Sequence, residues 1–261
     1  MPGKVYVERR DAVATLVLDH RERRNAISVS MWRELGLACA SLRDDPEVRC
    51  VVLRGAGEEA FVSGADISEF GEARGSAEAE RSYDEISGRG FGAVMNLEVP
   101  VIALIHGYCI GGGAALALAC DLRYAADDAS FAIPAARLGL GYAAAGIKGL
   151  IDVVGPADAK EIFFTARRYA ADEALAMGLV NRVFPKLELD AAVSEIADRI
   201  AGNAPLTLRA VKRAVRDLSL EPQQRRPADV HAAVAACFES EDYREGVRAF
   251  LEKRTPRFRG R

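Results

Sequence analysis

The sequence has few of the residues that build metal centres and disulfide frameworks. Its 261 residues include three histidines, which lie far apart, and five cysteines, which show no C-x-x-C spacing. Most of the cysteines stand in apolar stretches, so we expect buried, reduced thiols, no disulfide framework and no metal. Because reduced thiols are typical of a cytoplasmic protein, we expect that location.

An excess of charge of one sign is also lacking. Thirty-five Lys and Arg oppose 38 Asp and Glu, which gives a formal net charge of -3. Nucleic acid is attracted by a positive field, so we expect no nucleic-acid partner. Residues 1–11 lack the apolar core of a signal peptide, so we expect no export.

Long uncharged runs are scarce, and residues 99–120 form one that requires a check against a membrane span. The run exceeds the minimum length of about 18 residues. Pro100, His106 and the glycines at 107 and 111–113 interrupt it, and its apolar residues change from Val and Ile to Ala and Leu after the glycines. We therefore predict a buried strand, a glycine turn and a buried helix, and no membrane partner.

Hydrophobic periodicity alternates between that of strands and that of helices. Strands are predicted at 4–10, 12–19, 48–53, 122–126, 130–133 and 179–184, and helices after a cap at Ser28 and at 143–154, 157–166 and 172–177. This alternation predicts an α/β fold with parallel pairing. Residues 68–90 are acidic, small and rich in glycine, and they predict a surface loop leading into a helix or, alternatively, a flap over a site.

The last third of the chain has helical periodicity only, interrupted by Pro205, Pro222 and Pro227. We therefore divide the chain into an α/β core at 1–187 and an all-helical region at 188–261.

Two glycine-containing turns, 63–67 and 107–113, follow predicted buried strands. A helix that starts near Gly112 leaves its first N–H groups unpaired, and such groups bind negative charge. Neither turn matches G-x-G-x-x-G or the P-loop, so a nucleotide phosphate is not the expected ligand. From the residues alone, close packing of a helix on a sheet explains the glycines as well as an anion site does.

Six motifs, in order along nearly the whole chain, resemble those of the enoyl-CoA hydratase/isomerase (crotonase) family. They are Arg24-Asn25-Ala26-Ile27, Phe61-x-x-Gly64-Ala65-Asp66-Ile67, Gly107-Tyr108-Cys109-Ile110-Gly111-Gly112-Gly113, Cys120-Asp121-Leu122-Arg123, Ala174-x-x-Met177-Gly178-Leu179-Val180 and Phe250-Leu251-Glu252-Lys253-Arg254. The resemblance implies a crotonase-like β-β-α spiral core with an all-helical C-terminal trimerisation region. It also implies a homotrimer or a dimer of trimers, and an acyl-CoA substrate with no cofactor, because coenzyme A is part of the substrate.

The resemblance assigns residues to an acyl-CoA site. The backbone N–H groups of Ala65 and Gly112 would hold the thioester oxygen and stabilise its enolate. Further substrate contacts are expected from Ala26, Ser63, Asp66, Ile67, Gly111 and Pro134, and from Phe250 and Lys253 near the adenine and 3'-phosphate of CoA, in the same or a neighbouring subunit. Asp66 is expected to be mainly structural, as an acceptor of backbone N–H groups in its turn. The C-terminal basic run around Lys253 is alternatively a solvated tail.

Two departures from the family pattern concern the chemistry. Ala115 and Ala135 stand where family hydratases carry the two glutamates that activate and protonate water. Tyr142 is the candidate replacement, because its surroundings resemble the methylmalonyl-CoA decarboxylase branch, in which a tyrosine contacts the substrate carboxylate. That branch differs in having a histidine at the position of Asp66 and a glutamate after the glycines. A phenol packed at a loop edge is the alternative for Tyr142.

We therefore favour a decarboxylase-like lyase within the family. A divergent enoyl-CoA hydratase and a CoA-binding trimer without catalysis are the alternatives. His106 is expected to be a hydrogen-bonded core residue, and Arg137 and Lys148 are weaker candidates for contact with a substrate carboxylate.

Overall fold

Two sheets lie at the centre of the fold in the computed structural model, which describes residues 2–69 and 77–261. The larger sheet contains β1 (Lys4–Arg10), β2 (Val13–Asp19), β3 (Cys50–Gly55), β5 (Val101–Ile105), β7 (Leu122–Ala126) and β10 (Arg182–Phe184), in that spatial order. β1 and β2, both predicted as strands, form an antiparallel hairpin, and every other pair is parallel. The α/β prediction with parallel pairing is confirmed.

The smaller sheet is built from β4 (Ala60–Val62), β6 (Tyr108–Ile110), β8 (Ser130–Ala132) and β9 (Tyr169–Ala170). β4, β6 and β8 are parallel, and β9 runs antiparallel to β8. The sequence predicted only β8, at 130–133, and not β4, β6 or β9, because strands of two or three residues show little alternation of apolar and polar residues.

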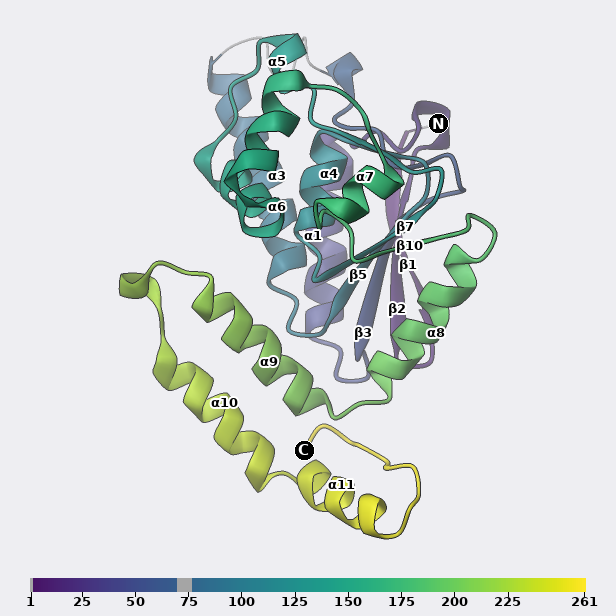
Figure 1. The fold of residues 1–261 in the computed structure, drawn as a ribbon, viewed down its shortest axis with the longest axis vertical. Helices are drawn as coiled ribbons and strands as arrows, with labels where there is room; N and C mark the ends of the chain where they lie inside the picture. Colours follow the sequence, from purple (N-terminus) through teal and green to yellow (C-terminus); the bar gives the residue numbers. More distant parts are fainter. Residues whose placement is uncertain (1, 70–76) are drawn as a thin grey trace.

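Helices cover the sheets and continue beyond them (Figure 1). They are α1 (Val29–Arg43), α3 (Ala77–Met95), α4 (Gly112–Leu118), α5 (Ala135–Leu138), α6 (Ala144–Thr165), α7 (Ala171–Ala176), α8 (Leu189–Ala201), α9 (Pro205–Leu218), α10 (Pro227–Glu239) and α11 (Glu241–Leu251). Ser28 caps α1 as predicted, because its hydroxyl accepts the Met31 N–H at 3.3 Å. The two helices predicted at 143–154 and 157–166 form α6, with a kink at Gly155.

Residues 68–90 were predicted as a surface loop leading into a helix, and that helix is α3, which begins at Ala77 and continues to Met95. Residues 70–76 of that prediction lie outside the described residues. The buried positions of α3 include Tyr83, Ser87, Gly90 and Val94, so a small and a polar residue interrupt the apolar pattern of its inner face. A Cβ atom on Gly90 would lie 2.5 Å from Cε3 of Trp32, so the glycine allows α3 to approach α1 closely.

Apolar residues fill both faces of the larger sheet. One face packs against α1, α3 and α4 through residues such as Trp32, Leu53 and Leu116. The other face packs against α8, whose Leu189 and Val193 meet strand residues in a second cluster. α8 therefore lies on the sheet although it falls within the region 188–261, and the division at 187/188 stays a prediction.

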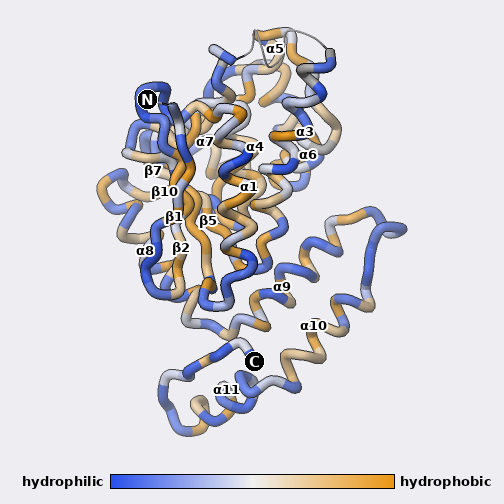
Figure 2. Tube along the Cα trace, turned by 180° about the vertical axis from the view of Figure 1, so that it is seen from behind, coloured by the Kyte–Doolittle hydropathy of each residue, from blue (hydrophilic) through white to orange (hydrophobic). Residues whose placement is uncertain are grey.

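The helices α9, α10 and α11 extend away from the sheets, at the end of the molecule opposite α5 (Figure 1). Orange and blue segments alternate along α9 and α10 in Figure 2, because apolar and charged residues follow each other along these helices. Among the described residues, no helix is both long enough and apolar enough to cross a membrane.

Candidate active site

The candidate site lies at one edge of the smaller sheet. β4, β6 and β8 are parallel neighbours, and Ile110 at the end of β6 pairs with Ala132 at the end of β8. The carboxyl ends of parallel strands meet at the same edge of a sheet, which is where α/β proteins bind ligands. The segments 63–65, 111–112 and 133–135, which follow these strands, are therefore brought together.

The Ala65 amide is turned outward by a bridge between Ala65 and Ile27. The Ile27 N–H donates to the carbonyl of Gly64 at 2.9 Å, and the Asp66 N–H donates to the carbonyl of Ile27 at 3.0 Å. The carbonyl of Gly64 and the N–H of Ala65 belong to one trans peptide plane and point in opposite directions. The Ala65 N–H therefore faces away from Ile27.

The Gly112 amide is turned outward by the start of α4. The carbonyl of Gly111 accepts the Ala115 N–H at 3.0 Å, and the Gly111 N–H donates to the carbonyl of Ala132 at 2.8 Å. The Gly112 N–H shares its peptide plane with the carbonyl of Gly111, so it points outward from the N-terminus of the helix. Within residues 2–69 and 77–261, neither this N–H nor that of Ala65 has a backbone acceptor.

The two amides lie close together. A Cβ atom placed on Gly112 would lie 3.8 Å from the Ala65 nitrogen and would meet no closer atom. On Gly113 the same atom would lie only 2.2 Å from the carbonyl oxygen of Val62. Close packing therefore explains Gly113, whereas Gly112 leaves open space beside the Ala65 amide.

Ala115 and Ala135, the positions where the resemblance places the family's two glutamates, carry only methyl groups. Ala115 is half-buried on α4, and Ala135 is buried at the start of α5 among core residues that include Ala114 and Ile133. Neither residue can donate or accept a proton through its side chain.

Tyr142 lies in the connection between α5 and α6. The N–H of Leu140 in that connection donates to the carbonyl of Ala135 at 3.1 Å, which holds the segment against the start of α5. The Tyr142 ring is half-buried and meets the edge of Phe163 from α6, with 4.9 Å between ring centroids. The tyrosine is thus supported by α6 and lies close along the chain to Ala135.

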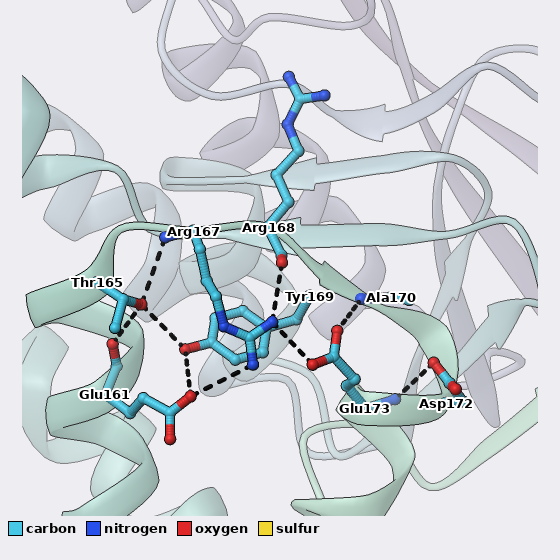
Figure 3. A network of polar contacts seen from close by, with 8 residues as sticks. All are labelled: Glu161, Thr165, Arg167, Arg168, Tyr169, Ala170, Asp172 and Glu173. Carbon is cyan, nitrogen blue, oxygen red and sulfur yellow. Dashed lines mark hydrogen bonds and ion pairs between the residues drawn. The ribbon is translucent and has the colours of Figure 1, made fainter.

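A polar network fastens the far end of α6 to the smaller sheet (Figure 3). The guanidinium of Arg167 lies over the ring of Tyr169, 3.7 Å from its centroid, and contacts Glu161 at 3.3 Å and Glu173 at 2.8 Å. Hydrogen bonds from the Ala170 N–H and from Arg167 hold the pKa of Glu173 below its ordinary value. Since β9 pairs Tyr169 with Phe131 of β8, the network links α6 to a strand that ends at the site.

Asp66 is a buried carboxylate beside the Ala65 amide. Its Oδ1 accepts from the Ser68 N–H at 3.0 Å, from the Ser68 hydroxyl at 2.7 Å and from Arg23 at 2.6 Å. Burial disfavours the charged form, but these hydrogen bonds outweigh burial, so the pKa of Asp66 lies below its ordinary value. The predicted turn hydrogen bond is present, whereas the partner Arg23, 43 positions away, has no local sequence signal.

Other predicted contacts fall around the same edge. Ser63 donates through its hydroxyl to the carbonyl of Arg23 at 3.0 Å, and Ala26 is buried next to the bridge at Ile27. Ile67 begins the 3-10 helix η2 (Ile67–Glu69), and Pro134 precedes α5. Their contacts with a substrate stay predictions.

Three further candidates are placed by their contacts. His106 is buried, and its Nε2 lies 2.5 Å from Oδ2 of Asp190 on α8, which confirms the expected core role. Lys148 pairs with Asp152 at 2.6 Å, so its charge is already matched within α6. Arg137 is exposed on α5.

Phe250 and Lys253 are not brought to the site within one chain. Phe250 lies on α11 and Lys253 just beyond it, and α11 is at the opposite end of the molecule from α5 (Figure 1). Both side chains are exposed. Only a neighbouring copy could place them at a CoA site, and that role stays a prediction.

Comparisons with known proteins identify the family of the chain. Residues 8–261 match the sequence model of the family described as enoyl-CoA hydratase/isomerase. The chain belongs to this family. It is 35% identical to the short-chain-enoyl-CoA hydratase of Clostridium acetobutylicum over 97% of this chain and 96% of that protein. It is 37% identical to the carnitinyl-CoA dehydratase of Proteus mirabilis over 100% of both chains.

Solved structures of the enoyl-CoA hydratase/isomerase family have the same fold. The chain resembles an enoyl-CoA hydratase/carnitine racemase from Magnetospirillum magneticum with a TM-score of 0.93 at 37% identity, over 98% of this chain and 96% of that one. An enoyl-CoA hydratase from Bacillus anthracis gives a TM-score of 0.92 at 32% identity, over 99% of this chain and 100% of that one. The predicted crotonase fold is confirmed, and the family acts on CoA thioesters.

Proposed function

We propose that this enzyme stabilises the enolate of an acyl-CoA thioester between the N–H groups of Ala65 and Gly112. The supporting observation is the convergence of the two outward-facing amides, with 3.8 Å between the Ala65 nitrogen and the Cβ position of Gly112. An enolate concentrates negative charge on the thioester oxygen, so fixed donors stabilise it more than the neutral carbonyl. One such donor typically contributes about 2.7–4 kcal/mol to the transition state.

The enolate is formed, in this proposal, by decarboxylation. Hydration requires groups that activate and protonate water, and the methyl groups of Ala115 and Ala135 cannot do so. In decarboxylation, the electrons of the breaking carbon–carbon bond move into the thioester as carbon dioxide leaves, so no base is needed. A proton then adds to the α-carbon. Tyr142 would orient the leaving carboxylate through its phenol.

The names of the relatives support a second candidate, a divergent enoyl-CoA hydratase. The Clostridium acetobutylicum protein is a hydratase and the Proteus mirabilis protein is a dehydratase. In that case another acid or base would replace the two glutamates. A third candidate, from a different class, is a CoA-binding trimer that has lost catalysis together with its glutamates.

Parallel assays with crotonyl-CoA and methylmalonyl-CoA separate these candidates. We expect release of carbon dioxide from methylmalonyl-CoA and no rapid hydration of crotonyl-CoA. Rapid loss of the conjugated thioester absorbance of crotonyl-CoA would support the hydratase. Tight binding of both thioesters without turnover would support the CoA-binding trimer, and a fall in rate of about tenfold in Tyr142→Phe would exclude that candidate.

We further propose that Phe250 and Lys253 complete the CoA site of a neighbouring copy. A lysine is suited to a 3'-phosphate as a charge partner, and an exposed phenylalanine is suited to an adenine ring. Phe250 is 82% exposed, which leaves its ring available to another chain. A homotrimer or dimer of trimers would supply this contact.

A further inference from the structure

Arg23 connects two segments that flank the Ala65 amide. It is the last residue of the 3-10 helix η1 (Arg21–Arg23), and its guanidinium contacts Oδ1 of Asp66 at 2.6 Å and also the hydroxyl of Ser68. Its carbonyl accepts the hydroxyl of Ser63 at 3.0 Å. One residue therefore contacts the chain on both sides of Ala65.

The backbone around Arg23 is itself fixed. Asn25 is buried, and its side-chain amide donates to the carbonyls of Ala56 at 3.0 Å and Ala60 at 2.8 Å, while its carbonyl oxygen accepts the His20 N–H at 3.0 Å. The segment that carries Arg23 is thus anchored to the start of β4. An arginine on an anchored segment can hold Asp66 in one place.

We propose that Arg23 is a positioning residue for the oxyanion hole, acting through Asp66 on the Ala65 amide. The inference rests on the proposed function of that amide. With Gly64 bonded to Ile27 on one side and Asp66 bonded to Arg23 on the other, the peptide that carries the Ala65 N–H is fixed at both ends. A donor held in place before the charge develops costs no reorganisation during the reaction.

Arg23 also has an electrostatic effect on the hole. Asp66 follows Ala65 directly in the sequence, and its carboxylate is buried. An unpaired negative charge at that position would oppose the formation of an enolate. The Arg23 guanidinium at 2.6 Å compensates that charge. Orientation of the amide and compensation of the charge both favour the enolate over the neutral thioester, so the loss of Arg23 should lower kcat more than it raises KM.

The test compares Arg23→Ala with Arg23→Lys and with Arg21→Ala as a matched control. Arg21 lies on the same 3-10 helix, is exposed and lies 3.5 Å from Asp19, so its removal takes away the same charge without touching Asp66. We expect Arg23→Ala to lower kcat for methylmalonyl-CoA at least about tenfold while KM stays within about threefold. Arg23→Lys should restore most of the lost kcat. Arg21→Ala should leave both kcat and KM unchanged.

A second measurement does not depend on turnover. The carbonyl stretching frequency of bound propionyl-CoA, labelled with carbon-13 at the thioester, reports the hydrogen bonds that its oxygen accepts. We expect a shift to lower frequency in the wild-type protein and in Arg21→Ala, and a smaller shift in Arg23→Ala. A full shift in Arg23→Ala would overturn the role of Arg23 alone, whereas no shift in the wild-type protein would overturn the oxyanion hole itself and the role of Arg23 with it.

Discussion

At the scale of single residues, Gly112 and Gly113 are glycines for different physical reasons. A side chain on Gly113 would collide with the backbone of β4, so this glycine allows α4 to pack on the smaller sheet. A side chain on Gly112 would collide with nothing but would occupy the space in front of the Ala65 amide. A sequence pattern cannot separate these two reasons, because both require only the absence of a Cβ atom.

This difference predicts the behaviour of Gly112→Ala. We expect the variant to fold normally, because the nearest atom to the new methyl group is 3.8 Å away. The methyl group displaces the thioester oxygen from the hole, so we expect kcat to fall by about a hundredfold or more. Steady-state kinetics with methylmalonyl-CoA and thermal unfolding measure both effects.

The control for this variant is Gly36→Ala. Gly36 lies within α1 with open space around it, so alanine there should leave kcat unchanged and stabilise the helix slightly. If Gly112→Ala retained wild-type kcat, the amides of Ala65 and Gly112 could not be the donors.

The candidate residues of the site were nominated from the sequence at this scale, but the contacts that hold them were not. Ala65, Gly112, Ala115 and Ala135 stand in local motifs, and their roles stay predictions. Arg23 contacts Asp66 from 43 positions away. Such a contact depends on the tertiary fold and has no local pattern in the sequence.

At the scale of elements, α3 shows why the start of a helix can be left open by the sequence. Its buried positions include Ser87 and Gly90, and Gly90 allows a close approach to Trp32 of α1. Because hydrophobic periodicity reports large apolar side chains, such residues weaken the helical pattern, and the boundary between loop and helix was not predicted. α1, with Met31, Trp32 and Leu35 on its buried face, was predictable for the opposite reason.

The contact between α11 and the segment that follows it is pH-sensitive. Glu245 accepts two hydrogen bonds from Arg254, at 2.6 and 2.9 Å, and one from the Arg257 N–H at 3.0 Å. The hydrogen bonds from Arg254 and Arg257 lower the pKa of Glu245 to about 2, from an ordinary value of 4.5. A lowered carboxyl pKa stabilises the fold above the unfolded value, and this stabilisation is lost as the pH falls toward the folded value.

We therefore expect Glu245→Gln to destabilise the protein at pH 6 and to do so progressively less as the pH falls from 4.5 toward 2. Urea unfolding of both proteins across this range measures the difference in free energy of unfolding. A difference that stayed constant with pH would show that the Glu245 carboxylate does not fasten the C-terminal segment.

At the scale of the whole molecule, α9, α10 and α11 carry large apolar side chains that are exposed within the described part of the chain. These side chains are Val211, Val215 and Leu218 on α9, Val234 and Phe238 on α10, and Tyr243, Val247, Phe250 and Leu251 on α11. Apolar side chains gathered on an extended group of helices are typical of a protein interface. This arrangement fits the proposed oligomerisation through the C-terminal helices.

We expect the protein to sediment as a trimer or hexamer of its 28.1 kDa chain. A charge at the interface is costly to bury, so Phe250→Asp should shift the population toward the monomer. Leu187→Asp is the control, because Leu187 is 93% exposed but lies outside α9–α11. A wild-type protein that remained monomeric at micromolar concentration would contradict the shared CoA site.

The central claim is that two amides stabilise an enolate while no side chain at the α-carbon removes a proton. The most direct test compares two rates. Mass spectrometry measures the exchange of the α-protons of propionyl-CoA in deuterium oxide, and a parallel assay measures the release of carbon dioxide from methylmalonyl-CoA. Our account predicts decarboxylation with α-proton exchange at least about a hundredfold slower than turnover. Exchange as fast as turnover would contradict it. Some acid or base would then reach the α-carbon, although neither Ala115 nor Ala135 can supply one.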